Sequence, residues 1–192
     1  QSDDLMRSYS LASVPDESFL ELHIKHVAKG QMSAWLCQDV HAGMTLSFQG
    51  PTGDCFYVPD DLEQTLVLAG TGTGLAPLFG IVRDALAAGH TGDIYLFHAS
   101  LAMAGLYYMD ELRVLVKRYS SLHYIPCVLH GDAPAGGLQG AVDALLVDKI
   151  PSFSGMRVYL CGDPAIIKSM RERCFLAGAP MQHIYADAFV FS

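Results

Sequence analysis

Charged residues are scarce in this chain, and long hydrophobic runs are absent. Only 17% of the 192 residues are charged and 51% are hydrophobic, which excludes a disordered chain and allows a substantial core. The net charge of −8 argues against nucleic acid or anionic lipid as a partner. No apolar run approaches the roughly 18–20 residues that span a bilayer, and the polar start does not resemble a signal peptide. We expect a globular cytoplasmic protein with one large or two small domains.

The cysteines and histidines also lack the spacing of metal sites. The five cysteines include no C-x-x-C pair, so neither a zinc site nor an iron–sulfur cluster is expected, and their scatter fits a reducing compartment. The eight histidines include no H-x-x-x-H, and no G-x-S-x-G elbow marks a hydrolase. We therefore predict no metal site.

The most informative stretch present is 65–82, TLVLAGTGTGLAPLFGIV. An apolar run ends in five residues, Gly70-Thr71-Gly72-Thr73-Gly74, and a helical pattern follows at once. Strand, glycine turn and helix together aim backbone N–H groups at a phosphate. The third glycine comes one residue too early for G-x-G-x-x-G, and a P-loop would need a lysine. A nucleotide site and a structural glycine turn both fit this stretch alone.

Beyond residue 60, short apolar runs alternate with helical patterns. This order predicts an α/β fold, with a doubly wound five-stranded parallel sheet over residues 61–192. The expected strands are 65–69, 93–98, 122–128, 156–161 and 182–188. The expected helices are 76–88, 108–118, 139–148 and 165–177.

The first sixty residues have a different, mostly antiparallel β pattern. Residues 7–12 suggest a short strand, and the runs 19–27 and 44–49 alternate apolar with polar side chains. In 19–27 one face carries Glu21, His23 and Lys25. A short helix is expected over 32–40.

Ligands of doubly wound sheets bind beyond the carboxyl ends of the strands. Three segments are expected there: the glycine turn, His98-Ala99-Ser100, and Cys161-Gly162-Asp163-Pro164. Each is also explained as an ordinary βα loop, but together they favour a pocket.

Four motifs, in order, resemble those of the ferredoxin–NADP reductase superfamily, in its bacterial oxygenase-reductase and flavin-reductase branch. Arg7-Ser8-Tyr9-Ser10 is similar to the family's R-x-Y-S flavin motif, and Gly30-Gln31-Met32-Ser33 to its G-x-x-S. The glycine turn through Pro77 matches A-G-T-G-x-A-P, and Cys161–Pro164 resembles C-G-x-P. Singly, these motifs are explained by a surface arginine on a strand, a helix N-cap and a core cysteine.

The resemblance implies a role for each motif. Arg7 would contact the FAD pyrophosphate, Tyr9 the flavin or ribityl chain, and Ser10 the region of flavin N5. Cys161 would lie where hydride passes between nicotinamide and flavin. Asp187 and Phe189, which resemble the family's D/E-x-F ending, would sit at the flavin.

These roles define the predicted site. The catalytic candidates are Ser10, Cys161, Asp187 and Phe189. The cofactor-binding candidates are Arg7, Tyr9, Ser10, Gly30, Met32, Ser33, Gly70, Thr71, Gly72, Thr73, Gly74, Pro77, His98, Ser100, Cys161, Gly162, Asp163 and Pro164. Leu106-Tyr107-Tyr108-Met109-Asp110-Glu111-Leu112 resembles a further family motif and is interpreted as a packing and capping feature.

The resemblance implies an FAD-dependent NAD(P)H oxidoreductase that passes a hydride from NADH to flavin and then electrons to an iron–sulfur protein, ferredoxin or oxygenase. NADH is favoured over NADPH, because no arginine or lysine lies in 98–101 or 129–132, where 2′-phosphate-binding members place cations. Two alternatives remain: an NAD(P)H-dependent free flavin or ferric reductase, and a nucleotide-binding subunit that has lost flavin. Residues 1–60 are expected to be only part of the flavin barrel, whose first strands would lie upstream.

Overall fold

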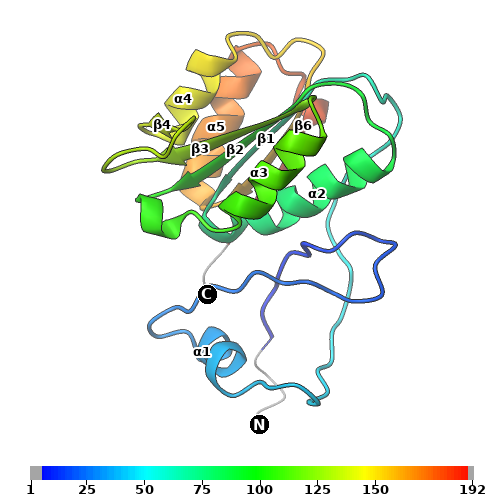
Figure 1. Cartoon of the computed structure of the whole chain (residues 1–192), viewed down its shortest axis with the longest axis vertical. Helices are drawn as coiled ribbons and strands as arrows, with labels where there is room; N and C mark the ends of the chain where they lie inside the picture. The colour runs from blue at the N-terminus through cyan, green and yellow to red at the C-terminus, as the bar shows by residue number, and fades with distance from the viewer. Residues whose placement is uncertain (1–5, 190–192) are drawn as a thin grey trace.

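A computed structural model describes residues 6–189, and its centre is a fully parallel six-stranded sheet (Figure 1). The strands are β1 (Leu66–Thr71), β2 (Ile94–Ser100), β3 (Leu122–Val128), β4 (Leu138–Gln139), β5 (Arg157–Gly162) and β6 (Ile184–Ala188). Their order across the sheet is β4-β3-β2-β1-β5-β6. The chain therefore builds the sheet outward from β1 in one direction and then returns to add β5 and β6 on the other side.

Two helices cover each face of the sheet. On one face lie α2 (Leu75–Ala87) and α3 (Met109–Arg118), and on the other α4 (Val142–Lys149) and α5 (Pro164–Leu176) (Figure 1). Successive residues of β1 alternate between the two layers. Leu66 and Leu68 pack with the α2 and α3 cluster, whereas Val67 and Ala69 pack with the α4 and α5 cluster. Burial on both faces explains why these strands are continuously apolar in the sequence.

The predicted strands and helices beyond residue 60 are confirmed, with ends that differ by three residues or fewer. The sheet has one strand more than expected, because the two residues of β4 pair with Cys127 and Val128 of β3. Two residues are too few to give a recognisable alternating pattern. Three short 3₁₀ turns complete the elements, namely η1 (Gly72–Gly74), η2 (Met103–Gly105) and η3 (Met181–His183).

The strand assignments in the N-terminal part need correction. Between residues 6 and 60 the structure shows one helix, α1 (Gln31–Gln38), close to the expected 32–40. The expected strands at 7–12 and 19–27 form a single antiparallel bridge, Leu11 with Leu22, and the run 44–49 is unpaired within the described residues. The alternating pattern shows which side chains share a face, but a strand also needs a hydrogen-bonded neighbour.

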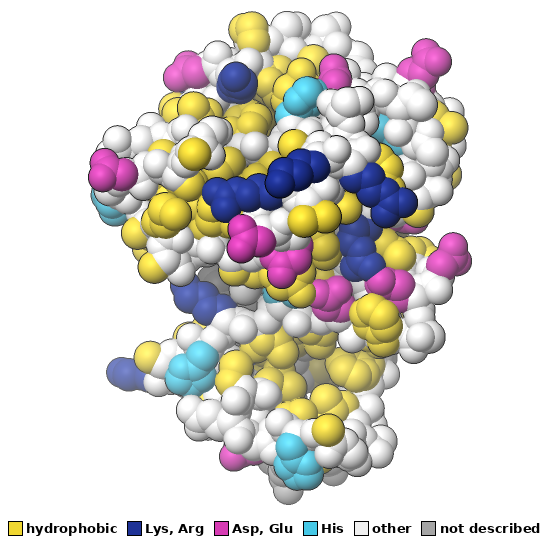
Figure 2. All heavy atoms as spheres, in the orientation of Figure 1, with side chains coloured by type: hydrophobic (Ala, Val, Ile, Leu, Met, Phe, Trp, Pro, Cys, Tyr) yellow, Lys and Arg dark blue, Asp and Glu magenta, His cyan; other side chains and the backbone are white. Residues whose placement is uncertain are grey.

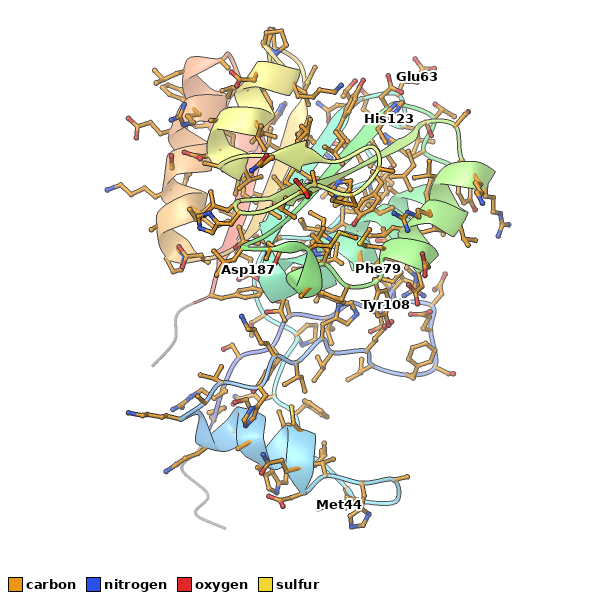
Figure 3. The ribbon with its side chains drawn as sticks, turned by 60° about the vertical axis from the view of Figure 1, so that its left-hand side comes forward. Met44, Glu63, Phe79, Tyr108, His123 and Asp187 are labelled. Atoms are coloured by element: carbon orange, nitrogen blue, oxygen red, sulfur yellow. The ribbon has the colours of Figure 1, made fainter. Side chains whose placement is uncertain are left out.

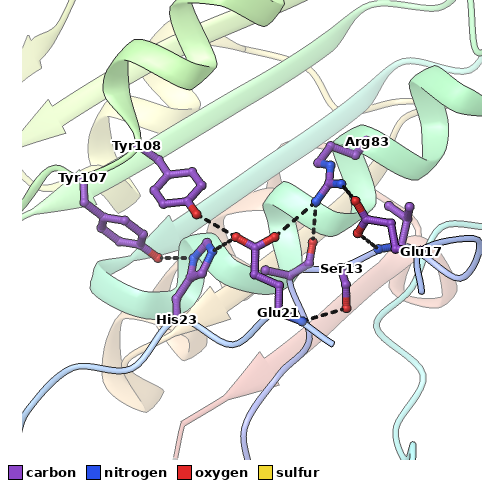
Figure 4. Close-up of polar contacts among 9 residues, drawn as sticks. Ser13, Glu17, Glu21, His23, Arg83, Tyr107 and Tyr108 are labelled. Carbon is purple, nitrogen blue, oxygen red and sulfur yellow. Dashed lines mark hydrogen bonds and ion pairs between the residues drawn. The ribbon is translucent and has the colours of Figure 1, made fainter. Parts of the chain in front are cut away.

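A network of ion pairs and hydrogen bonds joins the N-terminal part to the sheet domain (Figure 4). Glu21 accepts hydrogen bonds from the Tyr108 hydroxyl (2.6 Å) and from Arg83 of α2 (3.3 Å). His23 Nδ1 lies 2.8 Å from the Tyr107 hydroxyl, and Arg83 also pairs with Glu17. These contacts position 17–25 against the sheet domain. Burial raises the pKa of Glu21, but hydrogen bonds from Tyr108 and His23 outweigh it and leave the pKa lowered.

Cationic side chains and exposed apolar side chains gather on different parts of the surface. Figure 2 shows Lys and Arg side chains gathered in a band across one face of the sheet domain, and hydrophobic side chains exposed on the N-terminal part. The exposed apolar side chains there include Phe19, Leu20, Met44 and Phe48. No helix within 6–189 has the length and hydropathy needed to cross a membrane.

Candidate functional site

The order of the strands reverses next to β1, between β2 and β5, and this defines the site. β2 follows β1 on one side, and β5 flanks β1 on the other after the three strands β2, β3 and β4 have been added. In open parallel sheets the crevice at such a switch point is the usual ligand position. Figure 3 shows Asp187, Phe79 and Tyr108 at the end of the sheet domain that faces the N-terminal part, and Glu63 and His123 at the opposite end.

The glycine turn after β1 is packed on one side and open on the other. Gly74 has ordinary helical dihedral angles, φ −59° and ψ −14°. A Cβ at position 74 would lie 2.6 Å from the carbonyl carbon of Cys161, and closer still to its oxygen. Gly72 favours glycine for a different reason, because its φ of +54° is one that other residues rarely adopt. Space is not the constraint there, since an added Cβ would have no atom within 4 Å. The turn is thus fitted against β5 and presents the backbone of Gly72 to open space.

A cavity of about 600 Å³ begins at this turn and runs between the N-terminal part and the sheet domain. Gly72 and Thr73 contribute the turn, and residues 100–108, which lead from β2 to α3, contribute a second wall. The third wall is the segment 21–25. The full lining is Glu21, Leu22, His23, Ile24, Lys25, Gly72, Thr73, Ser100, Ala104, Gly105, Tyr107 and Tyr108. Its size is within the range of small-molecule sites.

Lys25 is the one cationic side chain in the cavity lining apart from the titratable His23, and we did not predict it as a site residue. An ammonium group in the same cavity lining as Gly72 and Thr73 suits an anionic ligand, because it adds a charge to the backbone N–H groups of the turn. Tyr107 and Tyr108 were likewise interpreted as packing residues only. A sequence signal did exist for Lys25, since Glu21, His23 and Lys25 share the polar face of one alternating run.

A second group of predicted residues meets at the carboxyl ends of β5 and β6. Cys161 is paired in register with Asp187, and the Phe189 amide donates a hydrogen bond to the carbonyl of Gly162 (2.8 Å). The Ser10 hydroxyl, 177 residues away in sequence, donates to Asp187 Oδ2 at 2.5 Å. The structure therefore brings all four predicted catalytic residues together beside the glycine turn.

Cys161 is a buried, protonated thiol. It has no exposed surface, and burial, together with the neighbouring Cys55 and Asp187, raises its pKa well above the usual value for a thiol. Its Sγ atom lies 3.7 Å from the Sγ atom of Cys55. At neutral pH this side chain is a small, neutral thiol.

The remaining turn residues are held by local hydrogen bonds. Thr71 Oγ1 accepts a hydrogen bond from the Asp163 amide (3.0 Å), which joins the turns after β1 and β5. Asp163 caps α5 through bonds from Ala165 (2.9 Å) and Ile166 (3.2 Å), with Pro164 in the first helical position. Pro77 is buried in the first turn of α2. For Asp163, Pro164 and Pro77 these contacts provide a structural role beside the predicted binding role.

The predicted flavin-side residues lie on the N-terminal part. Arg7 is exposed, and its Nη1 donates to the carbonyl of Met6 (2.8 Å). Tyr9 is half-buried, and desolvation raises its pKa. Ser33 is buried in the first turn of α1, where its hydroxyl donates to the carbonyl of Gly30 (3.1 Å) and accepts from the Val27 amide (3.1 Å). Gly30, Met32 and Ser33 thus form a closed helix start, and their contact with a diphosphate stays a prediction.

The structure places the predicted residue His98 in the core of the sheet domain. It is fully buried and does not line the cavity, although Ser100 of the same strand does. Its Nδ1 lies 3.1 Å from the Tyr124 hydroxyl, and Nε2 has no partner among the described atoms. Burial, and to a smaller degree His23, lowers its pKa to about 4. The side chain of His98 is thus a core residue, and its contact with the cofactor stays a prediction.

The residues present fit a bound dinucleotide at the switch point. The open backbone of Gly72 gives room for a phosphate, and Lys25 provides a cation in the same cavity lining. The guanidinium of Arg7 has no carboxylate partner within residues 6–189, so its remaining N–H groups can bind a second phosphate. No cluster of metal-binding side chains occurs in the described chain. Fold and site together define a doubly wound dinucleotide-binding protein.

Comparison with known proteins identifies the family. Residues 68–172 match the family model "Oxidoreductase NAD-binding domain", and residues 1–57 match "Oxidoreductase FAD-binding domain". The chain therefore belongs to the ferredoxin–NADP reductase-like superfamily of FAD- and NAD-binding oxidoreductases. The two matched domains indicate FAD and a nicotinamide dinucleotide as its cofactors.

Individual relatives agree with this assignment. The ferredoxin–NAD(P)+ reductase component of the naphthalene 1,2-dioxygenase system of Pseudomonas putida is 32% identical over 188 residues, which cover 98% of this chain and 57% of the relative. The reductase subunit of an Amycolatopsis aromatic O-demethylase is 36% identical over 169 residues, covering 85% of this chain and 50% of the relative. The crystal structure of an Amycolatopsis cytochrome P450 reductase has a TM-score of 0.89 and 30% identity, with coverages of 98% and 57%. The chain thus spans about half the length of these relatives.

Proposed function

We propose that the chain is the flavin- and nicotinamide-binding part of an NAD(P)H oxidoreductase, which takes a hydride from NADH and delivers electrons to a protein acceptor. One observation carries the proposal: Ser10, Cys161, Asp187 and Phe189, distant in sequence, converge next to the glycine turn. The boundary near residue 60 between a flavin-binding part and a nucleotide-binding part belongs to the same proposal. FAD, when bound, supplies hydride acceptance and the release of single electrons.

The dinucleotide is proposed to bind along the cavity. Its pyrophosphate would contact the backbone of Gly72 and Thr73, with Lys25 as the counter-charge. The adenosine end would extend toward the loops after β2 and β3. These loops lie side by side, because the amides of Leu129 and His130 donate hydrogen bonds to the carbonyls of Ser100 (3.0 Å) and Leu101 (2.9 Å).

The preference for NADH rests on the charge of those two loops. Neither 98–101 nor 129–132 contains an arginine or lysine, and the last residue of the second loop, Asp132, is exposed. A 2′-phosphate would therefore find no cation there and would be repelled by a carboxylate. Lys25 belongs to neither loop but to the lining segment 21–25, where it would serve the pyrophosphate of either coenzyme.

The residues at the reacting end act by position, not by acid–base chemistry of their own. Asp187 accepts a hydrogen bond from the Ser10 hydroxyl and so fixes the direction of that hydroxyl. Cys161 is a neutral, buried contact of small size, and its raised pKa prevents it from placing a negative charge in the path of a hydride. Exact placement of two reactants is a large contribution to rate even without proton transfer.

The electron acceptor is proposed from the relatives. Those described above are reductase components or subunits that serve a dioxygenase, an O-demethylase and a cytochrome P450, as their names state. An iron–sulfur protein or oxygenase component is accordingly the proposed partner. The test is steady-state reduction of a ferredoxin by NADH in the presence of the FAD-loaded chain. The proposal fails if the protein is inert with NADH although FAD is bound.

A nucleotide-binding subunit without flavin is the second candidate. The unpaired segments of residues 6–60 and the closed hydroxyl of Ser33 favour it. This candidate predicts NADH binding by a colourless protein that does not retain added FAD. A visible spectrum after FAD addition and gel filtration distinguishes the two. A reductase of free flavin or ferric complexes would instead turn over FAD as a substrate and release it.

A further inference from the structure

Two thiols from distant parts of the chain are in contact next to the proposed reacting end. Cys55 Sγ lies 3.7 Å from Cys161 Sγ, although the residues are 106 positions apart. Cys161 is the penultimate residue of β5, and Cys55 belongs to the irregular segment that leads from the N-terminal part toward β1. Among the described residues this is the only thiol–thiol contact. Cys37 is exposed on α1, and Cys127 and Cys174 are buried in the sheet domain without a neighbouring thiol.

The two sulfur atoms differ in access. Cys55 is half-buried, so a small molecule can reach it, whereas Cys161 has no exposed surface. A buried thiol beside an accessible one is the arrangement in which the accessible sulfur is oxidised first and the buried one then closes a disulfide.

The geometry permits closure by movement of one segment. A disulfide requires the two sulfur atoms to approach to about 2.0 Å. Residues 50–56 form neither helix nor strand, so no ladder of backbone hydrogen bonds fixes the position of Cys55. Cys161, in contrast, is fixed between β1 and β6 by hydrogen bonds on both sides of β5.

We propose that hydrogen peroxide oxidises Cys55 and Cys161 to a reversible disulfide between them. The Cys55 thiolate attacks peroxide, the O–O bond breaks, and Cys55 becomes a sulfenic acid as one water leaves. The Cys161 sulfur then attacks the Cys55 sulfur, an S–S bond forms, and the S–O bond breaks. The leaving hydroxide takes the Cys161 proton as a second water. Two thiols lose two electrons in total and peroxide gains them.

The functional consequence rests on the proposed function. The disulfide would remove the Cys161 thiol from the proposed hydride path and would tie residue 55 covalently to β5. We therefore expect NADH-dependent activity of the FAD-loaded chain to fall at least tenfold on oxidation and to return with dithiothreitol.

Peptide mapping of the wild-type chain tests the modification without reference to activity. The protein is treated with hydrogen peroxide, alkylated with N-ethylmaleimide, digested at low pH and analysed by mass spectrometry. We expect a Cys55 peptide linked to a Cys161 peptide, lighter by two hydrogen atoms than the sum of both and released by dithiothreitol. The proposal would be overturned if both cysteines were found alkylated, or if Cys55 were a sulfinic acid while Cys161 was alkylated.

Three variants sharpen the result. In Cys161→Ser the reaction should stop at a Cys55 sulfenic acid, which dimedone traps. In Cys55→Ser, peroxide should leave Cys161 reduced, because the accessible partner is gone. Cys37→Ser is the matched control, since it removes an exposed cysteine and should leave the linked peptide unchanged. Loss of the linked peptide in Cys37→Ser would contradict the Cys55–Cys161 assignment. If the linked peptide forms in a protein that is inert with NADH, the disulfide proposal stands and the proposed function fails.

Discussion

Two glycines of one turn, Gly72 and Gly74, provide a sharp test of how the site is built, because each is required for a different physical reason. Gly74 has dihedral angles that alanine adopts readily, but its added methyl carbon would lie 2.6 Å from the Cys161 carbonyl carbon. The neighbour is strand backbone and cannot rotate away. Gly72 has open space around it but a φ of +54°, which a Cβ disfavours.

The expected magnitudes follow from these two causes. Gly74→Ala must push the turn away from β5, and such overpacking costs about 1–3 kcal/mol, or more where backbone is the obstacle. Gly72→Ala pays only the left-handed backbone penalty of about 1–2 kcal/mol. For a chain of this length, 1 kcal/mol corresponds to roughly 2–4 °C in Tm. We expect Gly74→Ala to lower Tm by about 5–10 °C, and Gly72→Ala by about half as much.

The assay is thermal unfolding with NADH binding measured on the same samples. Gly89→Ala is the matched control, because Gly89 has a φ of +80°, no atom within 4 Å of an added Cβ, and no place in the cavity lining. It should lose stability as Gly72→Ala does, yet bind NADH normally, whereas Gly72→Ala should bind weakly. A Gly74→Ala protein as stable as the wild type would refute the packing of the turn against β5.

Three further predictions concern single side chains. Ser10→Ala should slow flavin reduction about 10- to 100-fold at unchanged FAD content, because a hydrogen bond to a charged group contributes about 1.5–3 kcal/mol; an unchanged stopped-flow rate would contradict it. Lys25→Gln should weaken NADH binding about fivefold, the equivalent of about 1 kcal/mol, with the difference shrinking at high salt; equal affinities by calorimetry at low salt would exclude the contact. Burial lowers the pKa of His98 from 6.5 to about 4 in the folded chain, so protonation favours unfolding, and stability is complete above pH 6.5 and lost as the pH falls toward 4. The loss is about 3 kcal/mol, at 1.36 kcal/mol per pH unit. Denaturant titrations at pH 6.5 and pH 4 should show a loss of stability that is smaller by this amount in His98→Phe than in the wild type. An equal loss in both proteins would disprove the prediction.

The sequence was most informative where the chemistry is local. The run from Thr65 to Pro77 specifies strand, turn and helix by itself, and its ends in the structure differ from expectation by only a residue or two. The convergence of Ser10 with Asp187 was also predictable, but only through the family resemblance. Nothing in the two segments alone encodes a hydrogen bond across 177 positions.

The failures have a common physical origin in tertiary context. Lys25 and Tyr107 line the cavity because two distant segments pack together, and periodicity within either segment does not report that contact. His98 lies within β2, two residues before its end, and the neighbouring Tyr107 and Tyr124 side chains help to bury it completely. The run 44–49 alternates as a strand does but has no paired neighbour within the described residues. The prediction was wrong because alternation shows which side chains share a face and does not show whether a neighbouring strand is present.

The most direct test of the central claim is an anaerobic titration of the FAD-loaded chain with NADH, followed by flavin absorbance. We predict that the flavin bleaches fully with about one equivalent of NADH, and that NADPH acts only at much higher concentration. A chain that retains FAD but keeps its full flavin absorbance in excess NADH would contradict the proposed hydride transfer.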